Sequence, residues 1–259
     1  MKTNFHIVML GLRESFRGED ELKRLQSKYK ASVFWGFRGE DLSASLTNYS
    51  SEQAKFWFNR ELTSGEIGCA FSHKEILLHF SNEPIDFLVV IEDDVKLDPK
   101  VDLQNLLQQL RQAELESMVL VCMAGKTAVS RRKLQLDGGR FEIARALSTP
   151  TSTQMLVFDK SALLAISEEA ANRTLGATAD FPPWYEDIVN FYVLTNPISI
   201  STGSETVIGE GRMNKRSNWL RKFGRMSMLA WIFQGRRYCS LRAYVRYVHG
   251  RAWAYRTTQ

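Results

Sequence analysis

The sequence predicts an α/β protein with a single sheet that is covered by helices. Apolar runs of strand length recur along the chain, and several of them are continuous, which is typical of strands buried on both faces. Amphipathic helical patterns lie between these runs, and this alternation indicates a sheet flanked by helices. The chain has 259 residues, of which 44% are hydrophobic, so it can bury a sizeable core.

The expected elements follow in chain order. Strands are expected over 5–10, 32–37, 87–91, 118–123 and 155–158, and helices over 19–29, 63–80, 101–116, 161–172 and 185–194. The helix over 63–80 has the clearest signals. Thr63 and Glu66 have the spacing of a capping box, and Ile67, Ala70 and Phe71 mark its apolar face.

The charges divide the chain into two parts. No Asp or Glu follows Glu210, whereas residues 211–259 contain twelve Lys or Arg, so that 1–210 carries a net charge of −7. We therefore expect one domain over 1–210 and a basic, mainly helical tail over 211–259. Such a split is typical of a protein with an anionic partner.

Apolar residues in the tail recur at helical spacing with basic residues beside them, namely Trp219, Phe223 and Met226 next to Arg221, Lys222 and Arg225. Basic amphipathic helices of this kind bind anionic membrane surfaces. Alternatively, the apolar stripe packs on the domain and the basic side chains are solvated. No run reaches the roughly 18–20 apolar residues of a membrane span. The three cysteines lack metal or disulfide spacing, and the N-terminus has no signal-peptide pattern, so a cytoplasmic, membrane-peripheral location is expected.

Three adjacent carboxylates follow the apolar run at 87–91, namely Glu92, Asp93 and Asp94. Ligands of open α/β sheets bind beyond the carboxyl ends of strands. Adjacent carboxylates repel one another unless a cation neutralises them, and Mg²⁺ or Mn²⁺ prefers oxygen ligands. Strand alternation would send Glu92 and Asp94 to the same side. The alternative is a solvated acidic turn before the next helix.

The helix that begins near Thr63 contains a second candidate group. Glu66 and His73 lie seven residues apart and therefore share one stripe of the helix. Gly65 and Gly68 are costly inside a helix unless another segment approaches closely. The simpler interpretation is a capped helix with one histidine at its edge.

The two segments together, LTSGEIGCAFSH at 62–73 and VVIEDDV at 89–95, resemble glycosyltransferase family 25, which includes lipopolysaccharide and lipooligosaccharide galactosyltransferases. The resemblance covers about residues 5–210 and is specific in these two motifs. It implies a GT-A-type, nucleotide-sugar-binding sheet and inversion at the anomeric carbon. It also implies a UDP-sugar donor, usually UDP-galactose. If the acceptor is a lipid-linked glycan, the basic tail would place the protein on the inner face of the bacterial inner membrane.

The resemblance also implies roles for single residues. Asp94 and Glu92 would hold Mn²⁺ or Mg²⁺, with Asp93 behind them. Further donor-binding residues would be Arg13, Ser15, Glu66 and His73, and apart from the resemblance Lys126 could screen the donor diphosphate. Arg13 could instead be a surface turn residue, and Lys126 could belong to a solvated loop.

An inverting transfer needs a base on the acceptor side. Asp180 is the first candidate because of its position in the family pattern. Glu186 and Asp187 follow, because the segment before them, Pro182–Tyr185, is rigid, aromatic and suited to sugar stacking. The alternative for Glu186 and Asp187 is that they only open a helix.

Two other functions fit parts of the pattern. A Mg²⁺-dependent phosphohydrolase or nuclease could use the same acids and bind nucleic acid through the tail, but the motif at 65–73 would then have no role. In a non-catalytic membrane- or nucleic-acid-binding protein, the three adjacent carboxylates would have no functional role. The sequence leaves open the acceptor sugar and linkage, the choice between galactose and glucose, and the oligomeric state.

Overall fold

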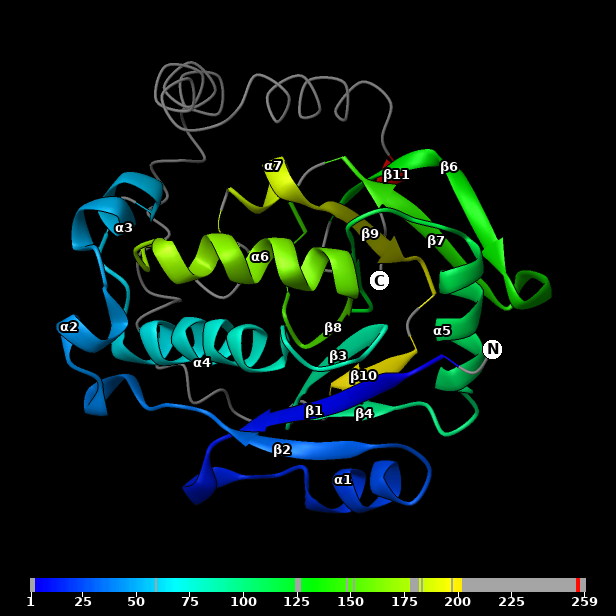
Figure 1. The fold of residues 1–259 in the computed structure, drawn as a ribbon, viewed down its shortest axis with the longest axis horizontal. Coiled ribbons are helices and arrows are strands. Elements are labelled where there is room, and N and C mark those ends of the chain that lie inside the picture. Colours follow the sequence, from blue (N-terminus) through cyan, green and yellow to red (C-terminus); the bar gives the residue numbers. More distant parts are fainter. Residues whose placement is uncertain are drawn as a thin grey trace.

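The computed structural model describes residues 3–58, 60–123, 127–147, 149–150, 152–177, 182, 184–196, 198–201 and 255–256. These residues form a mixed α/β fold with helices on both faces of one large sheet, which confirms the predicted fold class (Figure 1). The predicted basic tail over 211–259 lies outside the described residues, except for 255–256, and so does the boundary expected near 210.

Nine strands of the described residues form the main sheet, in the order β11-β6-β7-β9-β5-β8-β3-β1-β2. Their bounds are β1 (Phe5–Gly11), β2 (Ala31–Trp35), β3 (Phe87–Glu92), β5 (Met118–Val121), β6 (Ala128–Leu136), β7 (Phe141–Ala146), β8 (Met155–Asp159), β9 (Asn190–Leu194) and β11 (Tyr255–Arg256). β1 runs parallel to both β2 and β3, whereas β8 runs antiparallel to β3 and β5. A small second sheet pairs β4 (Val95–Leu97) with β10 (Ser199–Ser201).

Two pairs of helices cover the sheet. Helices α1 (Glu19–Gln26) and α5 (Leu103–Gln112) pack on one face, while α4 (Ser64–Phe80) and α6 (Lys160–Asn172) pack on the other. Three short helices, α2 (Ala44–Thr47), α3 (Ser51–Phe58) and α7 (Tyr185–Ile188), lie at the margins (Figure 1). Among the helices of the described residues, none is long and apolar enough to cross a membrane.

β1 explains why the core strands are continuous apolar runs in the sequence. Ile7 and Met9 point to the face covered by α1 and α5, and Val8 and Leu10 point to the face covered by α4 and α6. Because successive side chains alternate between faces and both faces are covered, the whole of β1 is buried.

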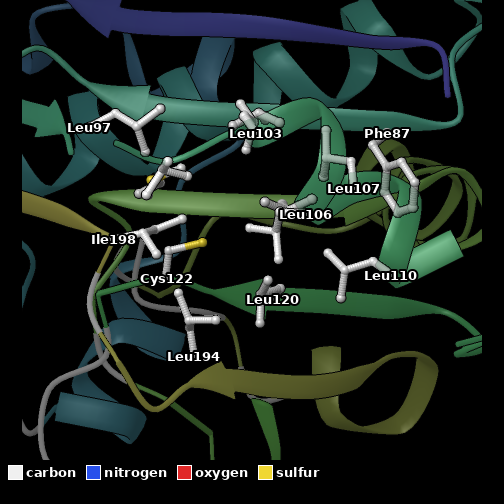
Figure 2. Close-up of a cluster of buried hydrophobic side chains, with 14 of the residues drawn as sticks. Phe87, Leu97, Leu103, Leu106, Leu107, Leu110, Leu120, Cys122, Leu194 and Ile198 are labelled. Carbon is white, nitrogen blue, oxygen red and sulfur yellow. The ribbon is translucent and has the colours of Figure 1, made fainter. Parts of the chain in front are cut away.

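Helix α5 supplies much of the core on its face. Leu103, Leu106, Leu107 and Leu110 repeat at helical spacing and are at most 2% exposed. They meet Leu120, Leu194 and Ile198 from the sheet side (Figure 2). Helix α5 begins two residues later than predicted, because Asp102 is its N-cap and accepts a hydrogen bond from the Asn105 backbone.

The prediction of a helix over 185–194 is wrong. Helix α7 ends at Ile188, and Asn190–Leu194 form β9, which pairs with β5 and β7. Phe191, Tyr192 and Val193 favour strands, and two neighbouring strands supply hydrogen-bonding partners that override a weak helical pattern. The β6–β7 hairpin and the β4–β10 pair were not predicted.

The core position of Leu106 allows a matched test of packing. Leu106→Ala should lower the free energy of unfolding by about 2–5 kcal/mol, because it leaves a cavity beneath α5. Leu164 on α6 is 46% exposed, so Leu164→Ala should change it by only about 0.5 kcal/mol. Urea denaturation of both variants measures the difference, and equal losses would contradict this placement of α5.

Candidate functional site

The carboxyl ends of the parallel strands β1, β2 and β3 meet at one edge of the sheet and border a cavity of about 210 Å³. Four groups of residues line it: the turn after β1, the segment 36–40 after β2, the acidic turn after β3, and one side of α4. Ser15, Glu92, Asp93 and Asp94 are the predicted site residues that line this cavity.

Helix α4 fits closely against the segment after β2. A Cβ atom at Gly68 would lie 2.5 Å from the Phe37 carbonyl oxygen, and one at Gly39 would overlap the Ser64 backbone. Ser72 Oγ accepts a hydrogen bond from the Phe37 backbone nitrogen at 2.8 Å and donates one to the Gly68 carbonyl at 2.7 Å. The glycine within the helix therefore permits a close approach that a side chain would block.

The start of α4 is the predicted capping box. Thr63 Oγ1 accepts from the Glu66 backbone nitrogen, and Glu66 Oε2 accepts from the Thr63 backbone nitrogen at 2.9 Å. Arg60 also donates to both carboxylate oxygens of Glu66, at 2.7 and 2.6 Å. Glu66 is buried in this network and does not line the cavity that the acidic turn borders.

Glu92, the last residue of β3, is held by two neighbouring elements. Because β8 runs antiparallel to β3, Thr153 just before β8 lies beside Glu92 and donates to its Oε1 at 2.7 Å. His73 of α4 places Nε2 3.3 Å from the same oxygen. His73 and Glu92 are thus brought together, as predicted residues of one site.

Asp93 is neutralised by the turn after β1. Its Oδ2 accepts from the Arg17 backbone nitrogen at 3.2 Å, and Nη2 of Arg17 lies 3.1 Å from Oδ1. The Asp93 backbone nitrogen donates to the Leu10 carbonyl at 2.9 Å. Asp93 therefore ties the turn after β3 to the turn after β1.

Asp94 lies in the turn between β3 and β4, because β3 ends at Glu92. Strand alternation therefore does not explain its direction, although Asp94 and Glu92 both line the cavity. The pKa of Asp94 is raised, first by burial and then by the charge of Glu92, while Arg17 opposes the shift. A hard divalent cation suits Glu92 and Asp94, because it would relieve this repulsion and prefers carboxylate oxygens.

Arg13 lies at the rim of the site. Its guanidinium carbon is 5.2 Å from the centre of the Trp35 ring, and the ring of Phe16 meets Trp35 edge-on. A cation over an aromatic face is attracted by the ring, so this contact positions Arg13 beside the ends of β1 and β2.

The candidate bases lie elsewhere or outside the described residues. Glu186 in α7 accepts a hydrogen bond from the Thr149 backbone nitrogen at 2.9 Å, and Asp187 is exposed. Neither lines the cavity. Asp180 and Lys126 lie outside the described residues.

A second, smaller hollow of about 60 Å³ lies between α4 and α6. Lys74, Pro182 and Trp184 line it, and the guanidinium carbon of Arg173 lies 5.0 Å from the Trp184 ring centre. His73 also lines this hollow, so it connects the hollow with Glu92.

Sequence reasoning assigned no role to Arg17, Thr153 or Cys69, nor to the segment 36–40. The carboxyl ends of parallel neighbouring strands lie at the same edge of a sheet. A parallel pairing of β1 with β2 and β3 would therefore have predicted that Arg17 and residues 36–40 approach the acidic turn. Thr153 could not have been placed without knowing that β8 is antiparallel to β3.

Comparison with known proteins relates this part of the chain to one family. The model of glycosyltransferase family 25, described as LPS biosynthesis protein, matches residues 7–137, slightly more than half of the chain. A procollagen galactosyltransferase 1 from Danio rerio is 31% identical over 138 residues. That match covers 49% of this chain and 21% of the relative, so the chain spans about a fifth of the relative's length.

Solved structures are less similar. A197 from STIV has 8% identity and a TM-score of 0.40, with 77% of this chain and 83% of that chain covered. Mannose-1-phosphate geranyltransferase from Thermus thermophilus has 13% identity and a TM-score of 0.37, with 75% and 74% covered. Both TM-scores are too low to assign a fold by similarity. The fold is therefore defined by the strand order and helix layers of this structure.

The family match includes every residue that lines the larger cavity, from Leu10 to Asp94. The α4 motif and the acidic turn, which carried the resemblance in the sequence, meet there through His73 and Glu92. The chain therefore belongs to glycosyltransferase family 25.

Proposed function

We propose that this protein is an inverting glycosyltransferase that moves a hexose, galactose from UDP-galactose, to a glycan acceptor of lipopolysaccharide or lipooligosaccharide. The observation that carries the proposal is that Glu92 and Asp94 line a cavity at the carboxyl ends of three parallel strands. The name of the Danio rerio relative supports galactose, and the family description supports the acceptor. Family membership favours this reaction over a phosphohydrolase, a nuclease or a non-catalytic binding protein.

The donor would bind in the larger cavity, on a GT-A-type sheet. Glu92 and Asp94 would hold Mn²⁺ or Mg²⁺, which when bound stabilises the negative charge on the departing diphosphate. Ser15 lines the cavity and Arg13 stands at its rim, so both can contact the nucleotide. Asp93 acts through Arg17, whose contact fixes the turn that would surround the donor.

The acceptor would approach from the side of the smaller hollow. Trp184 offers an aromatic face there, which suits stacking against a sugar ring. A carboxylate in the adjoining segment would take the proton of the acceptor hydroxyl as its oxygen attacks the anomeric carbon opposite the diphosphate. Asp180 is the first choice for this base, with Glu186 and Asp187 as alternatives.

The basic tail would hold the enzyme at the inner face of the bacterial inner membrane. Residues 211–259 contain twelve cations and no acid, which favours contact with anionic headgroups. A lipid-linked acceptor would then be met at the surface where it is embedded.

Replacement of Asp94 tests the metal role. Asp94→Asn should lower galactose transfer from UDP-galactose with Mn²⁺ by about 10²–10³-fold, the magnitude typical of losing one group that stabilises developing charge. Asp137→Asn is the matched control, because Asp137 lies in the turn after β6 and has a positive φ of 50° that Asn tolerates. The control should retain full activity, and a fully active Asp94→Asn enzyme would refute the metal role.

The same variant should be more stable than the natural protein at neutral pH. A raised pKa in the folded state means that the unfolded chain loses this proton first as pH rises, so ionised Asp94 destabilises the fold. The difference in urea midpoint should vanish as the pH falls below 3.8, the ordinary value for this carboxyl. A less stable Asp94→Asn protein would mean that any lost activity reflects a damaged fold.

Replacement of the three candidate bases tests the acceptor side. Asp180→Asn should lower transfer by about 10²–10⁴-fold, the contribution typical of a general base, while binding of UDP-galactose stays unchanged. Glu186→Gln and Asp187→Asn serve as matched comparisons and should retain most activity. Loss in Asp187→Asn with an active Asp180→Asn enzyme would contradict this assignment.

Charge reversal in the tail tests membrane binding. Arg221→Glu, Lys222→Glu and Arg225→Glu together should release the full-length protein from liposomes that contain anionic lipid, because each cation contributes about 1 kcal/mol near such a surface. The control reverses three exposed cations of the domain, Lys28, Lys100 and Arg132, for the same change in net charge. Equal binding of both triple variants in a sedimentation assay would contradict a specific role of the tail.

A further inference from the structure

Three side chains of different chemistry meet beside the larger cavity. Cys69 and His73 lie four residues apart on α4, so they share one face of the helix. Glu92 reaches them from the end of β3, and the ligand atoms of the three residues all lie within 4.8 Å of one another. Two of the three, Cys69 and Glu92, also line the cavity.

The spacing suits a small tetrahedral ion. Two ligands that each lie about 2.0–2.1 Å from zinc at the tetrahedral angle are about 3.3–3.4 Å apart. His73 Nε2 and Glu92 Oε1 are 3.3 Å apart. A thiolate at about 2.3 Å from the same ion would lie about 3.5 Å from the imidazole nitrogen. The ligand atoms already lie within 4.8 Å of one another, so small side-chain rotations can bring the thiolate to that distance.

The surroundings hold two of the ligands in place. The side chains of His73 and Glu92 are 10% and 25% exposed, so both are largely packed. Thr153 Oγ1 donates to Glu92 Oε1 at 2.7 Å, a contact of the kind that orients metal-binding carboxylates. The cluster is therefore built from two separate elements, α4 and β3, and Thr153 supports it from the segment before β8.

We propose that Cys69, His73 and Glu92 form a binding site for a thiophilic divalent cation, zinc. The ligand set separates this site from the Mn²⁺ or Mg²⁺ role of Asp94, because sulfur and imidazole ligands favour zinc whereas the hard cations take oxygen. Three protein ligands leave a fourth position, and the cavity beside Cys69 and Glu92 allows water or an anionic group of a substrate to fill it.

Of the two cysteines that the structure describes, Cys69 alone suits this role. Cys122 is 1% exposed in the core beside α5, and burial raises the pKa of its thiol to about 12. The thiolate is the form that binds metals, so Cys122 stays protonated and inert at neutral pH.

Zinc would also act on the transferase, and this consequence rests on the proposed function. Glu92 belongs both to the zinc cluster and to the pair that would hold the donor cation. A zinc ion on Glu92 would therefore compete with the donor cation, and zinc would inhibit transfer at concentrations that fill the cluster.

Cobalt substitution tests the site directly, without donor or acceptor. Titration of the full-length protein with Co²⁺ should give a thiolate-to-metal charge-transfer absorption in the near ultraviolet, which Zn²⁺ then removes. Cys69→Ser should abolish the band, and His73→Gln should raise the midpoint of the titration at least about tenfold. Cys239→Ser, which removes the third cysteine of the sequence, should leave the band unchanged.

Three results would overturn the proposal. The first is the absence of the band in the natural protein, and the second is its persistence in Cys69→Ser. The third is an unchanged midpoint in His73→Gln, which would place the metal elsewhere. Both variants remain interpretable if their circular dichroism spectra match that of the natural protein, and Cys69→Ala serves as a second thiol-free variant if Cys69→Ser does not fold.

An activity assay separates this proposal from the proposed function. With Mn²⁺ present, the zinc concentration for half inhibition should rise at least about tenfold in Cys69→Ser. Equal inhibition of the two proteins would contradict the link between the cluster and inhibition. A cobalt band without transfer from any nucleotide sugar would refute the proposed function alone, and transfer without a cobalt band would refute the zinc site alone.

Discussion

The placement of the site depends on the close contact between α4 and the segment that follows β2. Gly68 and Gly39 allow backbone to meet backbone there, and Ser72 fixes the contact with two hydrogen bonds. Because an α-helix is rigid, this contact determines where the residues that follow Gly68 on α4 lie. Cys69 and His73 are thereby carried to the wall of the cavity and to Glu92. Gly68 of the motif at 65–73 serves this approach from the helix, and Gly39 serves it from the segment after β2.

The fold was predictable where local signals and tertiary contacts agree. The capping box at Thr63 and Glu66 and the buried strands β1, β3, β5 and β8 follow directly from residue type and spacing. Asn190–Leu194 was not predictable in this way, because its strand form depends on partners in β5 and β7 that are distant in sequence. The β6–β7 hairpin was missed for a related reason: much of β6 is exposed at Arg131 and Arg132, so no apolar alternation marks it.

The acidic residues of the site were predictable from the sequence. The contacts that distinguish these residues from one another were not. The sequence placed Glu92, Asp93 and Asp94 at one strand end, and all three line the cavity. Alternation along a strand could not assign Asp94, because the strand ends two residues earlier. Asp93 pairs with Arg17, and Arg17 comes from the turn after β1, so this contact required knowledge of the sheet. Glu66 was expected to contact the donor, but it joins the capping box that its spacing from Thr63 predicts and also pairs with Arg60, which no local pattern indicates.

Ionised Asp94 disfavours the folded state, whereas neighbouring side chains hold Asp93 and Glu92 in place. Arg17 pairs with Asp93 and only partly offsets the burial and repulsion that raise the pKa of Asp94. Thr153 and His73 meanwhile hold one oxygen of Glu92 in place. A histidine nitrogen can hold either a proton or a metal ion, so the hydrogen-bonded and zinc-bound states of His73 and Glu92 exclude each other. A cation in the cavity would relieve this repulsion, and its second ligand beside Glu92, either Asp94 or Cys69, would decide between a hard cation and zinc.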